Sequence, residues 1–182
     1  SPSPAPSPSP SPTPSPTPSP SPTPAPAPSS PNNFATSEVR NSTGPEFHSV
    51  ISVWQDGTTG LGSVIGIVDT GIDEDSPEFT GRIHHASTDV VGRRGLTNPE
   101  SDHGTNVALV AAAAKNDSGV VGIAYQASIL ALRADGRGTC TDDCTFADGD
   151  IAVAIRRAVD NGANVVNLSL IHISEPTRQA EI

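Results

Sequence analysis

A carboxylate and an imidazole, Asp69 and His103, stand 34 positions apart in this chain. In a serine hydrolase such a pair supplies the orienting acid and the general base. The acid fixes the tautomer of the imidazole, which takes the proton of the nucleophile. The spacing alone leaves a simpler interpretation open, because an Asp before Thr70 and Gly71 is also typical of a turn or a helix N-cap. Which interpretation holds depends on the elements that carry the two residues.

The pattern around each residue predicts such an element. Gly62–Val68 is a short apolar run rich in β-branched residues, typical of a strand buried on both faces, and Asp69 stands at its carboxyl end. In open α/β sheets, ligands bind beyond the carboxyl ends of the strands. The alanine-rich stretch 101–115 predicts a helix that carries His103 in its first turn. Ser101 or Asp102 would be its N-cap, and Lys115 would lie in its last turn.

Four further segments complete the pattern. Residues 127–134 and 164–170 are predicted strands, and residues 150–159 are a predicted amphipathic helix followed by Asn161 and Gly162. A short helix is also predicted over residues 46–55. The alternation of short apolar strands with helices indicates an α/β fold with a parallel sheet covered by helices.

Two short motifs are superficially similar to other kinds of site. Residues 60–66 contain three glycines, but they precede their strand and lack the spacing of a dinucleotide-binding loop. Asp69-Thr70-Gly71 also matches the triplet of aspartic proteases. Those enzymes need two such carboxylates in an all-β fold, whereas one triplet occurs here in an α/β pattern.

Two groups of residues could bind metal ions. An acidic stretch has the clustered carboxylates that calcium prefers, but it lacks EF-hand spacing, and a solvated turn is favoured; its acids are Asp73, Glu74, Asp75 and Glu78. His84 and His85 are adjacent and would face opposite sides of a strand, so we interpret them as surface residues. No metal or other cofactor is therefore assigned.

Composition divides the chain. Residues 1–31 hold 15 of the 19 prolines, which indicates a disordered, extended polyproline spacer, and residues 32–59 form a lead-in segment. The formal net charge of −10 argues against nucleic-acid binding, which depends on Lys and Arg. No apolar run approaches the roughly 20 residues that span a bilayer. The chain lacks Met, so we expect that its N-terminus was processed or is incomplete.

Cys140 and Cys144 are the only cysteines. Their spacing in an Asp-rich loop without His is not that of a zinc finger, so we favour a disulfide between them. A disulfide would place the protein outside the cytosol.

Four ordered segments resemble the subtilisin-like serine proteases. IVDTGID (67–73) and DHGTNVA (102–108) are similar to the Asp and His motifs of that family. ALRADGRG (131–138) is similar to its substrate-pairing edge strand, and GANVVNLSL (162–170) to a strand that walls its first specificity pocket. The resemblance covers residues 60–170 and implies a three-layer α/β/α fold with a mostly parallel sheet.

The resemblance also implies roles. Asp69 would be the triad acid, His103 the base, and Gly136, Arg137 and Gly138 the lining of the substrate groove. The protein would be a secreted or cell-surface endopeptidase acting on polypeptides. The Pro-rich tract is similar to that of bacterial autotransporter-type subtilases, which implies a C-terminal anchoring or translocation domain in the parent protein.

Several features depart from the family pattern. Asn106 replaces the usual second histidine of the His motif, and Leu109 replaces a glycine. No Gly-Thr-Ser triplet, where the family carries its nucleophile, occurs in the chain, and the oxyanion-hole Asn is also absent. Residues 171–182 continue a stretch that matches a translated sequencing adapter, and we expect them to be an artefact. The chain is therefore expected to be an inactive N-terminal fragment of the catalytic domain. The alternative is a non-catalytic subtilase-like binding or structural protein.

Overall fold

A computed structural model describes residues 33–92, 94–96, 101–140 and 144–168. The expected spacer 1–31 and the expected artefact 171–182 both lie outside these residues. The described residues begin within the lead-in segment and end in the last predicted strand, so they include both members of the candidate proton-transfer pair.

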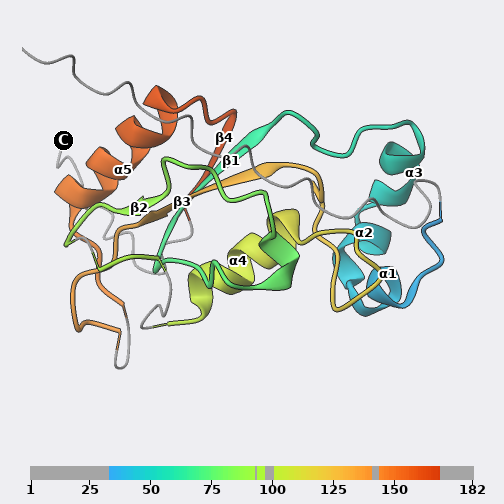
Figure 1. The fold of residues 1–182 in the computed structure, drawn as a ribbon, viewed down its shortest axis with the longest axis horizontal. Helices are drawn as coiled ribbons and strands as arrows, with labels where there is room; N and C mark the ends of the chain where they lie inside the picture. Colours follow the sequence, from blue (N-terminus) through green and yellow to red (C-terminus); the bar gives the residue numbers. More distant parts are fainter. Residues whose placement is uncertain (1–32, 93, 97–100, 141–143, 169–182) are drawn as a thin grey trace, which may run out of the picture.

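A four-stranded parallel sheet forms the centre of the molecule (Figure 1). Its strands, in spatial order, are β2 (Thr88–Asp89), β3 (Ser128–Arg133), β1 (Val64–Asp69) and β4 (Val165–Leu168). Each neighbouring pair is parallel, because every return passes through a helix or a long connection. The predicted parallel α/β fold is confirmed.

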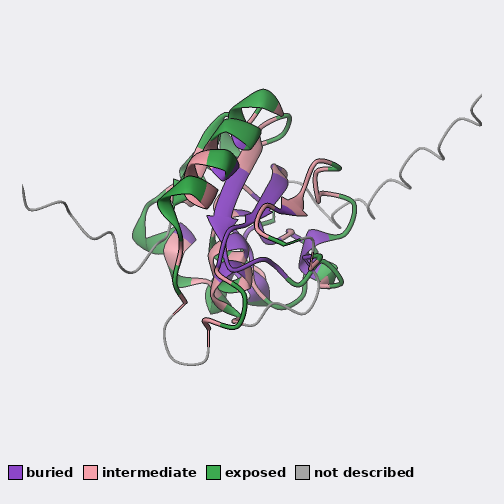
Figure 2. Ribbon diagram, turned by 90° about the vertical axis from the view of Figure 1, so that its left-hand side faces the viewer, coloured by how far each residue is buried: buried purple, intermediate pink, exposed green. Residues whose placement is uncertain are grey.

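Helices cover both faces of the sheet. On β1, Ile67 packs in one core with Ala108 of α4 (His103–Ala112), whereas the next residue, Val68, packs in a second core with Ala154 of α5 (Asp148–Asp160). Successive side chains of a strand point to opposite faces, so one apolar strand serves two cores. Figure 2 shows the buried strands between outer surfaces that are largely exposed. The predicted three-layer α/β/α arrangement is thus confirmed.

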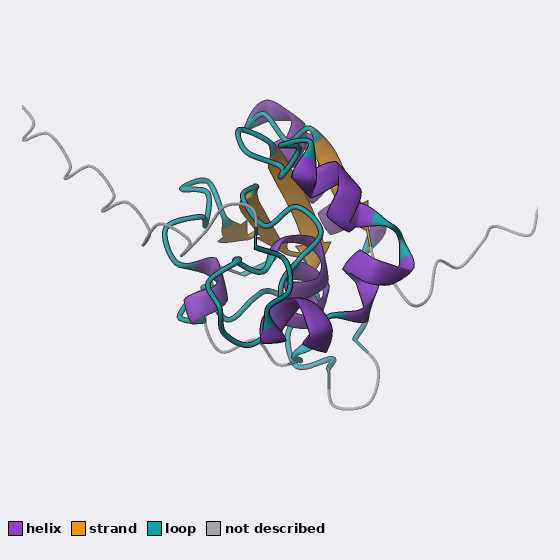
Figure 3. Ribbon diagram, turned by 90° about the vertical axis from the view of Figure 1, so that its right-hand side faces the viewer, coloured by secondary structure: helices purple, strands orange, loops and turns teal. Residues whose placement is uncertain are grey.

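The lead-in segment folds against this sheet and its helices. It forms three short helices, α1 (Ser37–Asn41), α2 (Thr43–Phe47) and α3 (Val50–Gln55), which lie beside the main body in Figure 1 and on the side that faces the viewer in Figure 3. The single helix predicted over residues 46–55 is wrong, because Ser49 adopts a left-handed conformation with φ of 56° and separates α2 from α3.

A third core joins the lead-in segment to the rest. Trp54 is buried, its ring packs edge-on against Tyr125 at 5.2 Å, and its Nε1 donates to the carbonyl of Ile123 at 2.8 Å. Glu38 is also buried, and its Oε2 accepts hydrogen bonds from the backbone N–H groups of Asn116 and Asp117 at 2.9 and 2.8 Å. These contacts fix residues 34–54 to the loop that follows α4.

The expectation for Lys115 is wrong. Helix α4 ends at Ala112, and Lys115 lies beyond it with its side chain buried. Its Nζ lies 3.9 Å from Glu38 Oε1 and 5.8 Å from the centroid of the Phe34 ring. Lys115 therefore pairs with the lead-in segment instead of interacting with the helix dipole.

Two features near β3 differ from the sequence interpretation. No strand was predicted between the first strand and the helix that carries His103, yet β2 lies there and pairs with the end of β3. The edge strand expected over residues 131–138 ends at Arg133 and lies inside the sheet, between β2 and β1. A 3₁₀ turn, η1 (Pro77–Phe79), places Phe79 in the same core as Ile67.

Candidate active site

Asp69 and His103 meet at the carboxyl end of β1. Nδ1 of His103 lies 2.8 Å from Asp69 Oδ1 and 3.1 Å from Oδ2. The Asp69 side chain is 1% exposed, whereas that of His103 is 35% exposed. A buried carboxylate thus holds one ring nitrogen of an imidazole whose side chain still reaches the surface.

Backbone contacts hold the start of α4 against the end of β1. Oγ1 of Thr70 accepts from the N–H of Gly104 at 3.1 Å and donates to the carbonyl of Ser101 at 3.1 Å. Ser101 Oγ accepts from the N–H of His103 at 3.2 Å, so the expected capping group is present, whereas Asp102 makes no side-chain cap. The bonds from Gly104 and His103 use backbone N–H groups that the first turn of a helix leaves without an intrahelical partner.

Gly104 allows the close approach of the two elements. A Cβ at this position would lie 2.2 Å from the carbonyl oxygen of Gly71 and 3.1 Å from Asp69 Oδ1. Only glycine therefore lets α4 come close enough for His103 to reach Asp69. The neighbouring Gly71 has φ of 94°, a conformation that other residues rarely adopt.

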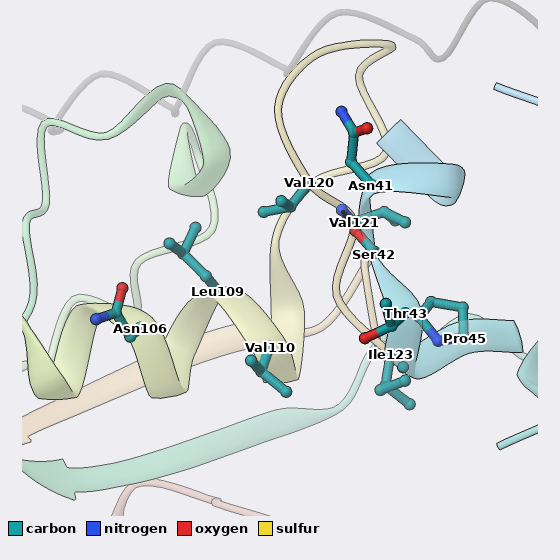
Figure 4. A pocket seen from close by; sticks show the side chains of 11 residues that line it. Asn41, Ser42, Thr43, Pro45, Asn106, Leu109, Val110, Val120, Val121 and Ile123 are labelled. Atoms are coloured by element: carbon teal, nitrogen blue, oxygen red, sulfur yellow. Dashed lines mark hydrogen bonds between the residues drawn. The ribbon is translucent and has the colours of Figure 1, made fainter. Parts of the chain in front are cut away.

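Asn106 and Leu109, the two residues that depart from the family's His motif, line pockets beside α4. Asn106 and Leu109 form part of a pocket of about 390 Å³ between α4 and the start of α2 (Figure 4). Asn106 also lines an adjacent hollow, together with His103 and Val110 of α4 and Asn167 of β4. The contacts of His103 Nδ1 with the two carboxylate oxygens of Asp69 involve neither side chain, so the departures change the surroundings of the pair and leave its geometry intact.

The predicted groove segment begins close to Asp69. The N–H of Ala134 donates to the carbonyl of Asp69 at 2.8 Å, and Gly136 follows two residues later. Gly136–Thr139 then form a turn, in which the Gly136 carbonyl accepts from Thr139 Oγ1 at 2.8 Å. The N–H of Gly136 donates to the carbonyl of Thr145 at 2.8 Å. Arg137 and Gly138 are exposed at the tip of this turn.

Sequence reasoning missed four charged residues that lie together where β2 and β3 end. This Asp–Arg network consists of Asp89, Arg94, Arg133 and Asp135. Arg94 Nε donates to Asp89 Oδ2 at 2.8 Å, and Arg94 Nη1 donates to Asp135 Oδ2 at 3.0 Å. Arg133 Nε donates to Asp135 Oδ1 at 2.8 Å. The sequence did contain one indication of this network: Arg133 lies in the apolar stretch 127–134, and Asp135 follows directly after it. A charge in a buried strand requires a partner.

Hydrogen bonds within the network shift the pKa values of Asp89 and Arg94. Burial disfavours the charged form of Asp89, but hydrogen bonds from the side chain and N–H of Arg94 and from the N–H of Val91 outweigh it, so the pKa of Asp89 lies well below its ordinary value. The hydrogen bond to Asp89 raises the pKa of Arg94, against the opposing effect of burial. Asp89 and Arg94 therefore both remain ionised at neutral pH.

The structure joins Cys140 to Cys144 in a disulfide. Oδ1 of Asp73 accepts from the N–H of Asp75, whereas Glu78 is buried and accepts from Asn116 Nδ2 at 3.2 Å, so these acids do not converge. Within the part of the chain that the structure describes, no three His, Cys, Asp or Glu residues gather as metal ligands. Nor does any described helix have the length and apolarity to cross a bilayer.

Comparison with known proteins identifies the family. The profile of the Subtilase family (Peptidase S8) matches residues 60–179. The chain belongs to the subtilase family. Its family match includes the ends of β1 and β3 and the start of α4, so the Asp69–His103 pair and the predicted groove segment both lie within it.

Known subtilases are similar to this chain over part of their length. Thermitase of Thermoactinomyces vulgaris is 37% identical over 131 residues, which cover 70% of this chain and 43% of thermitase. A thermophilic serine proteinase of Bacillus sp. (strain AK1) is 39% identical over 113 residues, or 60% of this chain and 26% of that protein. This subtilase chain thus spans less than half the length of these two relatives.

Solved structures have the same fold. Fervidolysin from Fervidobacterium pennivorans, described as a keratinolytic enzyme related to subtilisin, aligns with a TM-score of 0.57 and 27% identity. The alignment covers 65% of this chain and 18% of fervidolysin. MycP1, without its N-terminal propeptide, aligns with a TM-score of 0.51 and 25% identity over 68% of this chain and 36% of MycP1. These matches agree with the parallel α/β/α arrangement described above.

Proposed function

We propose that the protein carrying this chain is a serine endopeptidase in which Asp69 is the orienting acid and His103 the general base. The observation that carries the proposal is the contact of His103 Nδ1 with the buried Asp69 carboxylate at 2.8 Å. The carboxylate favours the tautomer with the proton on Nδ1, which leaves Nε2 as the proton acceptor. Membership of the subtilase family supports the same reaction.

The remaining member of the triad is a serine on a segment that this sequence does not contain. Its hydroxyl would attack the peptide carbonyl while His103 Nε2 takes the hydroxyl proton. His103 would then pass that proton to the departing amine and leave an acyl-enzyme. Water would hydrolyse the ester with His103 again acting as base. Because no Gly-Thr-Ser triplet occurs in residues 1–182, we propose that this chain alone does not hydrolyse peptides.

Polypeptides are the proposed substrates, and Gly136, Arg137 and Gly138 are proposed to line the groove that receives them. The exposure of Arg137 and Gly138 and the origin of this segment beside Asp69 support this role. The disulfide supports a secreted or cell-surface location, because such bonds persist in oxidising compartments.

The uninterrupted gene provides the test. A downstream Gly-Thr-Ser motif should be present, and the encoded protein should react with a fluorophosphonate probe at that serine. His103→Ala should abolish labelling, and a purified chain of residues 1–182 should not be labelled. An intact reading frame without such a serine would refute the protease and support the alternative, a non-catalytic binding or structural subtilase. Labelling that persists in His103→Ala would refute the role of the histidine.

A further inference from the structure

The Asp–Arg network lies between the sheet and the predicted groove segment, and it takes no part in the Asp69–His103 contact. Asp135 is its central member: it is fully buried and immediately precedes Gly136. Its carboxylate accepts from Arg133 and Arg94 at 2.8 and 3.0 Å. Asp89, Arg133 and Asp135 are buried and Arg94 is largely covered, which costs desolvation energy. The matched hydrogen bonds among these charges offset that cost and give the arrangement a defined geometry.

Arg94 binds the main chain in addition to the carboxylates. Its Nη2 donates to the backbone carbonyl of Asp135 at 2.7 Å. That carbonyl belongs to the peptide group that joins Asp135 to Gly136. Asp89 holds Arg94 in place, because its Oδ2 accepts from both the N–H and the Nε of Arg94 at 2.8 Å. The guanidinium thus fixes the peptide plane that leads into the groove segment.

The other side of the turn is held by neutral groups. Thr139 Oγ1 donates to the carbonyl of Gly136 at 2.8 Å and accepts from the N–H of Thr145 at 3.1 Å. Gly136 and Gly138 have no Cβ, and glycine has more accessible backbone conformations than any other residue. Without restraints at both ends, this segment would lose more conformational entropy when it pairs with a substrate.

We propose that Arg94 is a positioning residue for the substrate: it orients the Asp135–Gly136 peptide so that Gly136–Gly138 present one backbone arrangement to an extended peptide. The proposal rests on the proposed function, and it extends that function to a residue outside the matched motifs. Arg94 holds Asp89 and the Asp135–Gly136 peptide, whereas the proposed proton transfer depends on the separate contact of His103 with Asp69. The loss of Arg94 should therefore weaken the binding of long substrates and leave proton transfer unchanged.

The kinetic test uses the protein encoded by the uninterrupted gene. Arg94→Lys keeps the charge but loses the planar fork that bonds Asp89 and Asp135 together. We expect KM for a tetrapeptide amide to rise about tenfold, with kcat and the KM for a single-residue ester within about twofold of wild type. Arg156→Lys, the same change on the exposed face of α5, is the matched control and should change nothing. An equal loss of kcat on both substrates would overturn the proposal.

Hydrogen exchange gives a readout that does not need activity. In Arg94→Lys, amides of residues 135–139 should exchange at least several-fold faster, whereas those of β1 and the first turn of α4 should not change. Unchanged exchange at residues 135–139 would overturn the positioning role, whatever the kinetics show. If the wild-type protein hydrolyses neither substrate, the proposed function fails, and the exchange measurement still decides whether Arg94 orders the segment.

Discussion

Asp69 and Asp135 are buried aspartates at the carboxyl ends of neighbouring strands, but their partners differ. Asp69 ends β1, is 1% exposed and contacts the imidazole of His103. Asp135 follows β3, is 0% exposed and contacts the guanidinium groups of Arg94 and Arg133. Backbone pairing of β1 with β3 places the two aspartates near each other in the sheet.

The carboxyl end of one sheet therefore holds two carboxylates with different partners and different proposed roles. A guanidinium is a planar fork of N–H donors, so Arg94 and Arg133 hold the Asp135 carboxylate in a defined geometry. The partner of Asp69 is an imidazole, a group that can act as a general base, and the His103 side chain is 35% exposed. The Asp69–His103 pair therefore suits the proposed proton transfer, whereas the Asp135 arrangement suits the fixing of backbone.

The largest expected effect is on catalysis, from Asp69→Asn in the uninterrupted protein. An amide of the same shape would donate to Nδ1 of His103 and favour the tautomer with the proton on Nε2. Nε2 could then not accept the serine proton, so kcat should fall about 10⁴-fold. Steady-state hydrolysis of a peptide ester measures this. Asp160→Asn, at the exposed end of α5, is the control. A loss below about tenfold would show that Asp69 does not orient the base, and the contrast with Asp135 would fail.

The second effect is on stability, from Arg94→Met. It removes a cation from two buried carboxylates, Asp89 and Asp135, and should lower the free energy of unfolding by about 3–5 kcal/mol. Urea unfolding followed by circular dichroism measures it. Arg156→Met, on the exposed face of α5, should cost less than about 0.5 kcal/mol. Equal losses of unfolding free energy in the two variants would mean that Arg94 does not stabilise the buried carboxylates of Asp89 and Asp135.

The third effect tests the close approach that creates the reactive pair. Gly104→Ala would place Cβ 2.2 Å from the Gly71 carbonyl oxygen, so α4 must move away from β1. We expect a loss of about 1–3 kcal/mol in stability and a weakened His103–Asp69 hydrogen bond. Differential scanning calorimetry and the Nδ1 proton resonance of His103 measure the two parts.

Gly149→Ala is the matched control for this variant. Gly149 lies in α5, where an added Cβ would meet nothing within 4 Å, so alanine should stabilise the protein by about 0.5–1 kcal/mol. If Gly104→Ala instead kept full stability and an unchanged Nδ1 resonance, the approach of α4 to β1 would not depend on this glycine.

The last prediction concerns how the contribution of Asp89 to stability depends on pH. Because the pKa of Asp89 is depressed in the folded protein, its contribution to stability is complete above its unfolded-state value of about 4 and is lost as the pH falls below it. The stability difference between wild type and Asp89→Asn should therefore shrink below about pH 4. Urea unfolding between pH 3 and 7 tests this sign. A difference that grows on acidification would contradict it.

The parallel α/β pattern and the candidate pair Asp69 and His103 could be predicted from local sequence alone. A short, continuous apolar run such as 64–68 predicts a strand that is buried on both faces, because such a strand has no solvent-facing polar residues at alternate positions. Asp69 and His103 were found because their flanking motifs are local in sequence. The domain boundaries, the catalytic roles of Asp69 and His103, the roles of the groove residues and the expected artefact at 171–182 remain predictions.

Which charged residues contact one another depends on the tertiary structure. Asp89, Arg94 and Asp135 are spread over 47 residues and carry no common motif, and β2 is too short to show a period. Lys115 likewise looked like the end of a helix until its contact with Glu38 was visible. A buried ion pair depends on chain segments that fold together from distant positions, and such proximity leaves no periodic trace in the sequence. The Asp69–His103 distance itself also required the structure, because the absent side chain of Gly104 sets it.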